Sequence, residues 1–313
     1  MKTPNQQFEP IQKRARLFGS LILLLIVSPC IRADEPLFGF TYTTDLLPRG
    51  KFELTLWSTT RFLKYPGGKF LLQETRFEQE YGLTDKLQLA LYETYDYTSA
   101  FHNGPFGATT PPEQFSYYQP GTDDYFTKGR FVGISAEIIY RTLSPYLDPV
   151  GLAFYEEPTF GPGFIESESK LILQKNFHDD LLVFALNLTY APEFRWLPDD
   201  LNPSATSLQE ETDVNVDLGA SYRFMDNWSG ALEFIFESEF NSYDFNHQSN
   251  GGYYLGPTIH YAGEHFFFTA DFYEQMPWAA EHTDTVPGSI VGGRIVDNDF
   301  EKYRARIKIG WYF

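Results

Sequence analysis

Apolar and polar residues alternate with a period of two along most of the chain. Strict alternation predicts a β-strand with one apolar and one polar face. The last eleven residues are also long enough for a tilted strand to cross a lipid bilayer. One face of this segment carries Tyr303, Ala305, Ile307, Ile309, Trp311 and Phe313, and the other carries Arg304, Arg306, Lys308, Gly310 and Tyr312.

The same period predicts twelve strands, which fall near residues 52–57, 71–80, 87–92, 132–140, 152–157, 165–175, 182–190, 214–224, 230–240, 253–261, 266–274 and 303–313. Short links at 82–86, 141–151, 176–181, 225–229 and 262–265 alternate with longer ones at 63–70, 97–130, 191–212, 241–252 and 275–301, and a brief link lies near 158–164. An even number of strands with alternating turns and loops is typical of bacterial outer-membrane barrels. We therefore predict an all-β fold, a transmembrane antiparallel up-and-down β-barrel of about twelve strands. A soluble secreted β-sandwich is the alternative.

The first 33 residues predict an export signal. Basic residues between Lys2 and Arg16 precede an apolar run over residues 17–31, which is too short to span a membrane and has the length of a signal-peptide core. Cleavage after Ala33 would leave residues 34–313 as a single barrel domain. A lipoprotein signal at Cys30 is the alternative, and Pro29 disfavours it.

The net charge of the chain restricts the classes of partner that it can bind. The formal charge is −18, and removal of residues 1–33 takes away five bases and one acid, which leaves 19 bases, 41 acids and a net charge of −22. A nucleic-acid partner is not expected, because phosphate binding requires clustered positive charge. The exported chain has no cysteine, so its fold must depend on hydrogen bonding and packing.

The C-terminal strand resembles the assembly signal of bacterial outer-membrane barrels, which ends in Phe after apolar residues at alternate positions. Ile309, Trp311 and Phe313 carry this resemblance. It implies outer-membrane lipid and the barrel-assembly machinery as partners. If the first strand runs outward, the twelfth runs inward and leaves Phe313 in the periplasm. Twelve strands would place the N-terminus of the barrel on the same side.

If the apolar face meets lipid, the polar face lines the lumen. An acidic wall opposite a basic stripe on the last strand could favour cations or zwitterions. Alternatively, the charges pair with one another and fill a narrow barrel. The lumen-lining candidates are Glu74, Arg76, Glu78, Glu80, Glu166, Glu168, Lys170, Asp213, Asp217, Glu233, Glu237, Asp271, Arg304, Arg306 and Lys308.

Neither a metal site nor a cofactor is expected. The acid pairs Asp123–Asp124, Asp199–Asp200 and Asp297 with Asp299 lack a complete calcium-loop pattern, so we interpret them as solvated loop charge. The six histidines are too scattered to form a ligand set.

Residues 247–251, which read His-Gln-Ser-Asn-Gly, resemble the His-x-Ser-Asn-Gly core of outer-membrane phospholipase A. That resemblance implies His247 as base and Ser249 as nucleophile. The downstream segment of that family is absent, and no Asn occurs between Asn250 and Asn298. The motif also falls in a predicted polar loop, so we do not expect an enzyme.

Residues 36–50, together with 80–85 and 143–149, resemble an uncharacterised family of bacterial outer-membrane barrel proteins. The resemblance covers nearly the whole exported chain and implies fold and location, with no assigned activity. The leading functional hypothesis is a passive channel or transport-type protein for small solutes of unknown identity. A phospholipase-like hydrolase and a non-conducting structural or adhesion barrel are the alternatives.

Overall fold

The computed structural model describes residues 37–64, 68–104, 107–112, 115, 120–121, 123–198, 206–279, 290–291 and 294–313. The signal peptide expected at residues 1–33 and the acid pair Asp199–Asp200 lie outside these residues. Residues 33–313 form one compact unit. No helix in the described part of the chain is long and apolar enough to cross a membrane.

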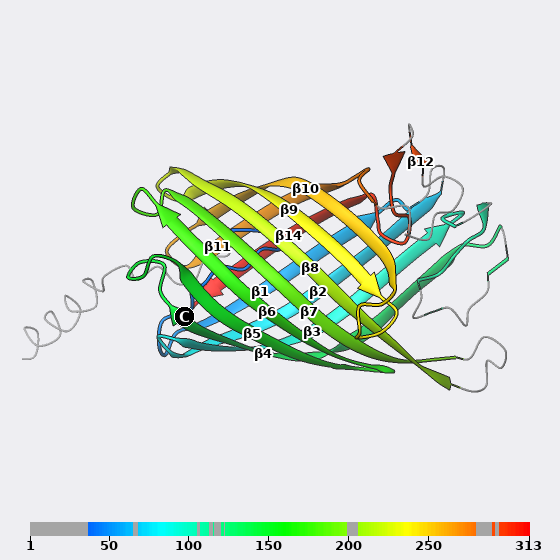
Figure 1. The fold of residues 1–313 in the computed structure, drawn as a ribbon, viewed down its shortest axis with the longest axis horizontal. Coiled ribbons are helices and arrows are strands. Elements are labelled where there is room, and N and C mark those ends of the chain that lie inside the picture. The colour runs from blue at the N-terminus through cyan, green and yellow to red at the C-terminus, as the bar shows by residue number, and fades with distance from the viewer. Residues whose placement is uncertain are drawn as a thin grey trace, which may run out of the picture. The chain divides into compact units, whose positions relative to one another are not determined.

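Twelve antiparallel strands close into a single barrel, because the first strand pairs with the last (Figure 1). Their bounds are β1 Phe52–Phe62, β2 Lys69–Thr84, β3 Leu87–Phe101, β4 Phe126–Leu143, β5 Gly151–Gly161, β6 Phe164–Phe177, β7 Leu182–Pro198, β8 Thr206–Met225, β9 Trp228–Phe240, β10 Gln248–Ala262, β11 Phe266–Met276 and β14 Tyr303–Tyr312. β12 (Ile290–Val291) and β13 (Arg294–Ile295) form a separate two-stranded sheet. The predicted fold and strand number are therefore confirmed.

The strands run further than the alternation predicted at one end of the barrel. We call this the loop end; its connections are 63–68, 102–125, 162–163, 199–205, 241–247 and 277–302. The opposite turn end has connections 85–86, 144–150, 178–181, 226–227 and 263–265. β8, for example, begins at Thr206 rather than near 214, because its ladder with β7 continues through residues 206–213, most of which are polar. The assignment of 248–251 to a loop was wrong, since β10 begins at Gln248, whereas His247 does lie in the connection before it.

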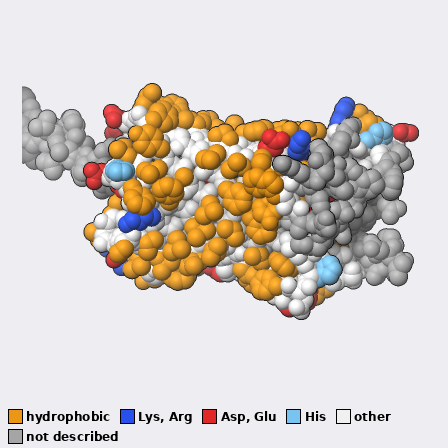
Figure 2. Space-filling view, turned by 45° about the horizontal axis from the view of Figure 1, so that its top comes forward, with side chains coloured by type: hydrophobic (Ala, Val, Ile, Leu, Met, Phe, Trp, Pro, Cys, Tyr) orange, Lys and Arg blue, Asp and Glu red, His pale blue; other side chains and the backbone are white. Residues whose placement is uncertain are grey.

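The outer wall of the barrel is apolar. Large hydrophobic side chains on alternate positions, such as Phe77, Leu91, Ile138 and Leu232, are about half exposed. Hydrophobic side chains cover much of the face of the barrel that Figure 2 shows. The inner wall carries the polar side chains of the same strands, most of them buried. Period-two alternation produces this separation, because successive side chains of a strand point to opposite faces.

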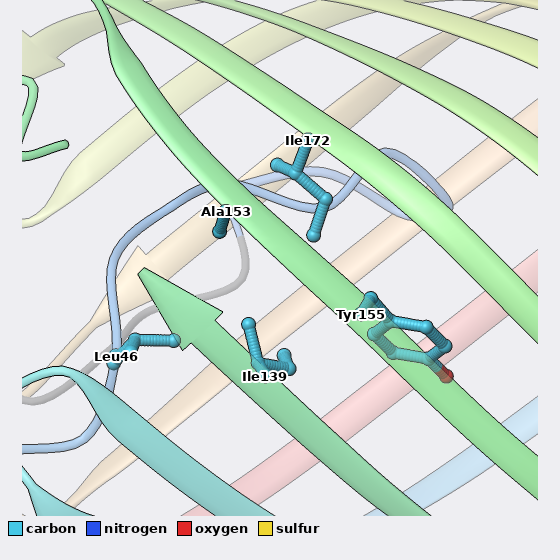
Figure 3. Close-up of a cluster of buried hydrophobic side chains, with 5 residues drawn as sticks. All are labelled: Leu46, Ile139, Ala153, Tyr155 and Ile172. Atoms are coloured by element: carbon cyan, nitrogen blue, oxygen red, sulfur yellow. The ribbon is translucent and has the colours of Figure 1, made fainter. Parts of the chain in front are cut away.

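Residues 37–51, the inner segment, have no regular secondary structure, and residues 37–48 among them are buried or half-buried against the inner wall. Leu46 joins a buried cluster with Ile139, Ala153, Tyr155 and Ile172 of β4, β5 and β6 (Figure 3). The sequence pattern had not indicated this placement. A segment ahead of the first strand therefore occupies part of the barrel interior.

Candidate functional site

Side chains of the inner wall satisfy the backbone of the inner segment. Without a ladder partner, a buried N–H must find another acceptor. The amides of Tyr42, Thr44 and Leu47 donate to three amide side chains, Asn187 at 2.6 Å, Gln174 at 2.6 Å and Gln88 at 2.7 Å. The three amide side chains therefore hold the segment across β7, β6 and β3.

Glu233 of β9 is the main anchor of the inner segment. Its carboxylate is fully buried and accepts the backbone amides of Gly39 at 2.7 Å and of Phe40 and Thr41 at 3.0 Å. It also accepts the hydroxyls of Thr41, Thr258 and Tyr273. Six hydrogen bonds stabilise a buried charge that would otherwise be strongly unfavourable.

The segment approaches the wall so closely that glycine is needed at contact points. A Cβ on Gly39 would lie 2.0 Å from the Asp271 carboxylate, and one on Gly219 would lie 2.5 Å from the Phe38 ring. The Arg306 guanidinium donates to the Gly39 carbonyl at 3.0 Å and lies 3.5 Å from the Phe40 ring centroid. Close packing therefore requires a glycine both in the inner segment, at Gly39, and in the wall, at Gly219.

Toward the loop end, the barrel holds a cavity of about 310 Å³, which we call the wide cavity. Seven carboxylates and five basic side chains line it, together with aromatic rings of the inner segment and wall. Its charged lining is Arg61, Arg76, Glu166, Glu168, Lys170, Arg195, Glu211, Asp213, Asp217, Glu237, Glu239 and Arg306. The cavity is therefore polar and carries an excess of acids.

Toward the turn end lies a smaller cavity of about 40 Å³, the narrow cavity. Its charged lining consists of Glu53, Glu78, Glu80, Glu137 and Lys308. Tyr42 of the inner segment and Trp57 of β1 line both cavities. These two rings therefore stand at the constriction between the wide and narrow cavities.

Arg304 of β14 is the most completely buried base of the interior. Its Nη2 donates to the Glu237 carboxylate at 2.7 Å, and Nη1 pairs with the same group. Nε pairs with Glu301, and the guanidinium lies 4.5 Å from the Tyr254 ring centroid. Two carboxylates and an aromatic face thus compensate one fully buried charge.

The structure divides the fifteen lumen-lining candidates into groups. Glu233 and Arg306 hydrogen-bond the inner segment, and Asp271 accepts the backbone amide of Arg306. Arg304 forms an ion pair with Glu237, and Arg76 forms one with Glu74. The wide cavity is lined by Arg76, Glu166, Glu168, Lys170, Asp213, Asp217, Glu237 and Arg306, and the narrow cavity by Glu78, Glu80 and Lys308.

Sequence reasoning missed several interior residues. Three of them are charged and lie on inner positions: Glu137 of β4, Arg195 of β7 and Glu211 of β8. Extending the period-two alternation along these strands would have found them. Gln88 and Asn187 were missed because the lumen-lining candidates were chosen by charge, and amide side chains are neutral. No periodic signal marks the inner segment, so nothing in its local pattern predicts its position.

A second segment, residues 296–302, folds over the loop end. Asp297 accepts the backbone amides of Gly251 and Asp299, both at 2.9 Å, and the Tyr254 hydroxyl donates to the Glu301 carbonyl at 2.8 Å. Burial raises the pKa of Asp297 to about 6, although these amides act to lower it. A raised carboxyl pKa contributes stability at low pH that is lost as the pH rises through about 6.

The phospholipase-like residues do not contact each other. The Ser249 hydroxyl donates to the Glu239 backbone carbonyl at 3.2 Å, and His247 Nδ1 bonds the Asn241 side chain at 3.1 Å. A nucleophile and its base should instead lie within hydrogen-bond reach. The geometry therefore does not favour the hydrolase alternative.

Comparison with known proteins adds a family and a fold. A model of a family of unknown function (DUF6662) matches residues 30–313. No curated protein matches the chain in sequence. An outer membrane channel from Pseudomonas putida F1 is 11% identical with a TM-score of 0.55, and the match covers 86% of this chain and 98% of that one. The NanC porin is 11% identical (TM-score 0.48, 82% and 98% covered), and the KdgM porin is 9% identical (0.44, 83% and 99%). The likeness to the channel shows a shared barrel fold.

Proposed function

We propose that this chain, which belongs to a family of unknown function (DUF6662), is an outer-membrane channel for small polar solutes. The wide cavity is the observation that carries the proposal. A barrel with an apolar outer wall encloses about 310 Å³ lined by charged side chains. An interior that served only to stabilise the barrel would be filled by its side chains instead.

The inner segment sets the width of the proposed path. Tyr42 and Trp57 separate the wide cavity from the narrow one, and the narrow cavity holds only about 40 Å³. Passage of a solute larger than water therefore requires the inner segment to shift. In the present arrangement the channel is in a narrow state.

The orientation follows from the two ends of the barrel. Outer-membrane barrels have short periplasmic turns and longer extracellular loops. The start of β1 at Phe52 and the C-terminal Phe313 pair with each other at the turn end. We accordingly place both ends of the barrel in the periplasm and the wide cavity toward the cell exterior.

In planar bilayers we expect the protein to conduct weakly and to prefer cations. Seven carboxylates against five bases line the wide cavity, and four against one line the narrow cavity, so both sides of the constriction repel anions. The reversal potential across a KCl gradient measures this preference. An anion preference would contradict the charge argument. Absence of current at any voltage would instead favour a non-conducting structural or adhesion barrel.

The barrel-assembly machinery is the proposed partner of the C-terminal strand. Trp311 and Phe313 are 46% and 65% exposed, so their rings are available for recognition. We expect Phe313→Ala to reduce severalfold the membrane-inserted fraction, measured by heat-modifiable gel migration. Phe266→Ala is the matched control, because Phe266 is an exposed ring that pairs with Trp311 at the same end. Equal losses in both variants would contradict a specific recognition role.

A further inference from the structure

An unpartnered carboxylate faces the wide cavity. Asp217 of β8 is 7% exposed, and it forms no hydrogen bond or ion pair with any described residue. Burial of a carboxylate without a partner is unfavourable. Lys170 is the base that acts on it electrostatically, but the ammonium of Lys170 is already paired with Glu168. Asp217 therefore retains unused capacity to bind a positive group.

Two further groups near Asp217 also lack partners. Thr189 is 4% exposed, and its hydroxyl has no hydrogen bond, although it lines the same cavity. Asp213 lies four residues before Asp217 on the same face of β8, and its Oδ1 is buried without a partner. Thr189 pairs with Asn215, the residue midway between the two acids. One hydroxyl and two carboxylates thus lie along the inner face of two adjacent strands, with Thr189 level with the midpoint between the two acids. Four residues of a strand separate the acids by about 13 Å.

The remaining acids of the wide cavity add to this negative potential. Glu168, Glu211 and Glu237 pair with bases, as the ion pairs with Lys170, Arg195 and Arg304 show. Glu166 and Glu239 form no ion pair with a described residue and line the same space. The excess negative charge is consequently carried by Asp213, Asp217, Glu166 and Glu239.

The aromatic floor of the cavity already accommodates an ammonium group. The Lys170 ammonium lies 4.8 Å from the Tyr42 ring centroid and 4.4 Å from that of Tyr155. Such distances permit cation–π attraction. The floor beside Asp217 is therefore compatible with positively charged nitrogen.

We propose that the wide cavity binds a small organic cation, a solute with two ammonium or guanidinium groups, one held by Asp217 and the other by Asp213, with the Thr189 hydroxyl between them. This inference rests on the proposed channel function and names its solute class. The volume of about 310 Å³ suits a small organic molecule.

A divalent metal ion fits the wide cavity less well. The carboxylate oxygens of Glu211, Asp213 and Glu239 lie within 4.8 Å of one another. However, Glu211 is bonded to Arg195, and Glu239 accepts the Asn250 amide. Two of the three potential ligands are thus already engaged, whereas Asp217 and Thr189 are not.

Calorimetric titration of the full-length folded barrel in detergent tests this site. The probe is 1,4-diaminobutane, and 1,4-butanediol is the neutral probe of the same length. We expect the diamine to bind and the diol not to bind. Asp217→Asn, which keeps the size of the side chain, should weaken diamine affinity about 10- to 100-fold, as expected for loss of a hydrogen bond to a charged group. Asp244→Asn, which removes an exposed loop acid that lines neither cavity, is the matched control and should bind as wild type does.

Equal affinity in Asp217→Asn and wild type, or equal binding of diol and diamine, would overturn the proposal. So would calcium displacing the diamine with a dependence on Glu211 rather than Asp217. If Asp217→Asn does not give a heat-modifiable barrel, Asp213→Asn provides the same comparison. Diamine binding without bilayer current would retain the site and contradict the channel, whereas current without diamine binding would do the reverse.

Discussion

Replacement of Glu233 by alanine is expected to increase single-channel conductance severalfold. The variant leaves the amides of Gly39, Phe40 and Thr41 without their shared acceptor. Each unsatisfied buried N–H costs about 1–3 kcal/mol, so docking of the inner segment should weaken by about 3 kcal/mol or more. A change of that size shifts the ratio of docked to undocked segment by roughly 100-fold. Bilayer conductance and protease cleavage within residues 37–51 would both report the change.

Glu168→Gln is the matched control for this experiment. It removes one interior carboxylate that pairs with Lys170 and does not hydrogen-bond the inner segment. We expect its conductance to stay close to that of the wild type. Increased proteolysis of Glu233→Ala without increased current would mean that the segment leaves but does not limit conduction. Unchanged proteolysis and current would contradict the anchoring role of Glu233.

Replacement of Arg304 by methionine is expected to produce the largest loss of stability. The guanidinium is fully buried between Glu237 and Glu301, so its removal leaves two carboxylates without their central base. Removal of one partner from a buried ion pair typically destabilises a protein by 3–5 kcal/mol. The measurement is the temperature at which the folded band disappears in heat-modifiable gel migration, and we expect a clear decrease.

Arg130→Met provides the comparison for Arg304. Arg130 pairs with one carboxylate, Asp96, and its side chain is 25% exposed, so water can replace part of the interaction. We expect a much smaller decrease than for Arg304→Met, since partly exposed ion pairs contribute about 0–1 kcal/mol. Adding Glu237→Gln and Glu301→Gln to Arg304→Met should recover part of the stability. Equal decreases in the two single variants would contradict the special role of Arg304.

Much of the barrel could be predicted from local pattern. In β14, Ile307 and Trp311 are exposed while Arg304, Arg306 and Lys308 are buried, as their alternation predicted. Side-chain direction in a strand depends on residue parity alone, so the two faces can be assigned without knowledge of any neighbour. The full length of β8 escaped prediction, because the polar run from Gln209 to Asp213 interrupts the alternation of polarity near the loop end.

The sequence by itself determined the number of strands, their approximate positions and the side of the wall on which their residues lie. Only the tertiary structure decided what the interior residues contact. The amide of Leu47 finds its acceptor 41 residues away in Gln88, and that of Gly39 finds its acceptor 194 residues away in Glu233. Such contacts depend on the pairing register and closure of the whole barrel. Closure also leaves Asp217 unpaired while Glu168 and Glu237 of the same cavity pair with bases, which parity cannot distinguish.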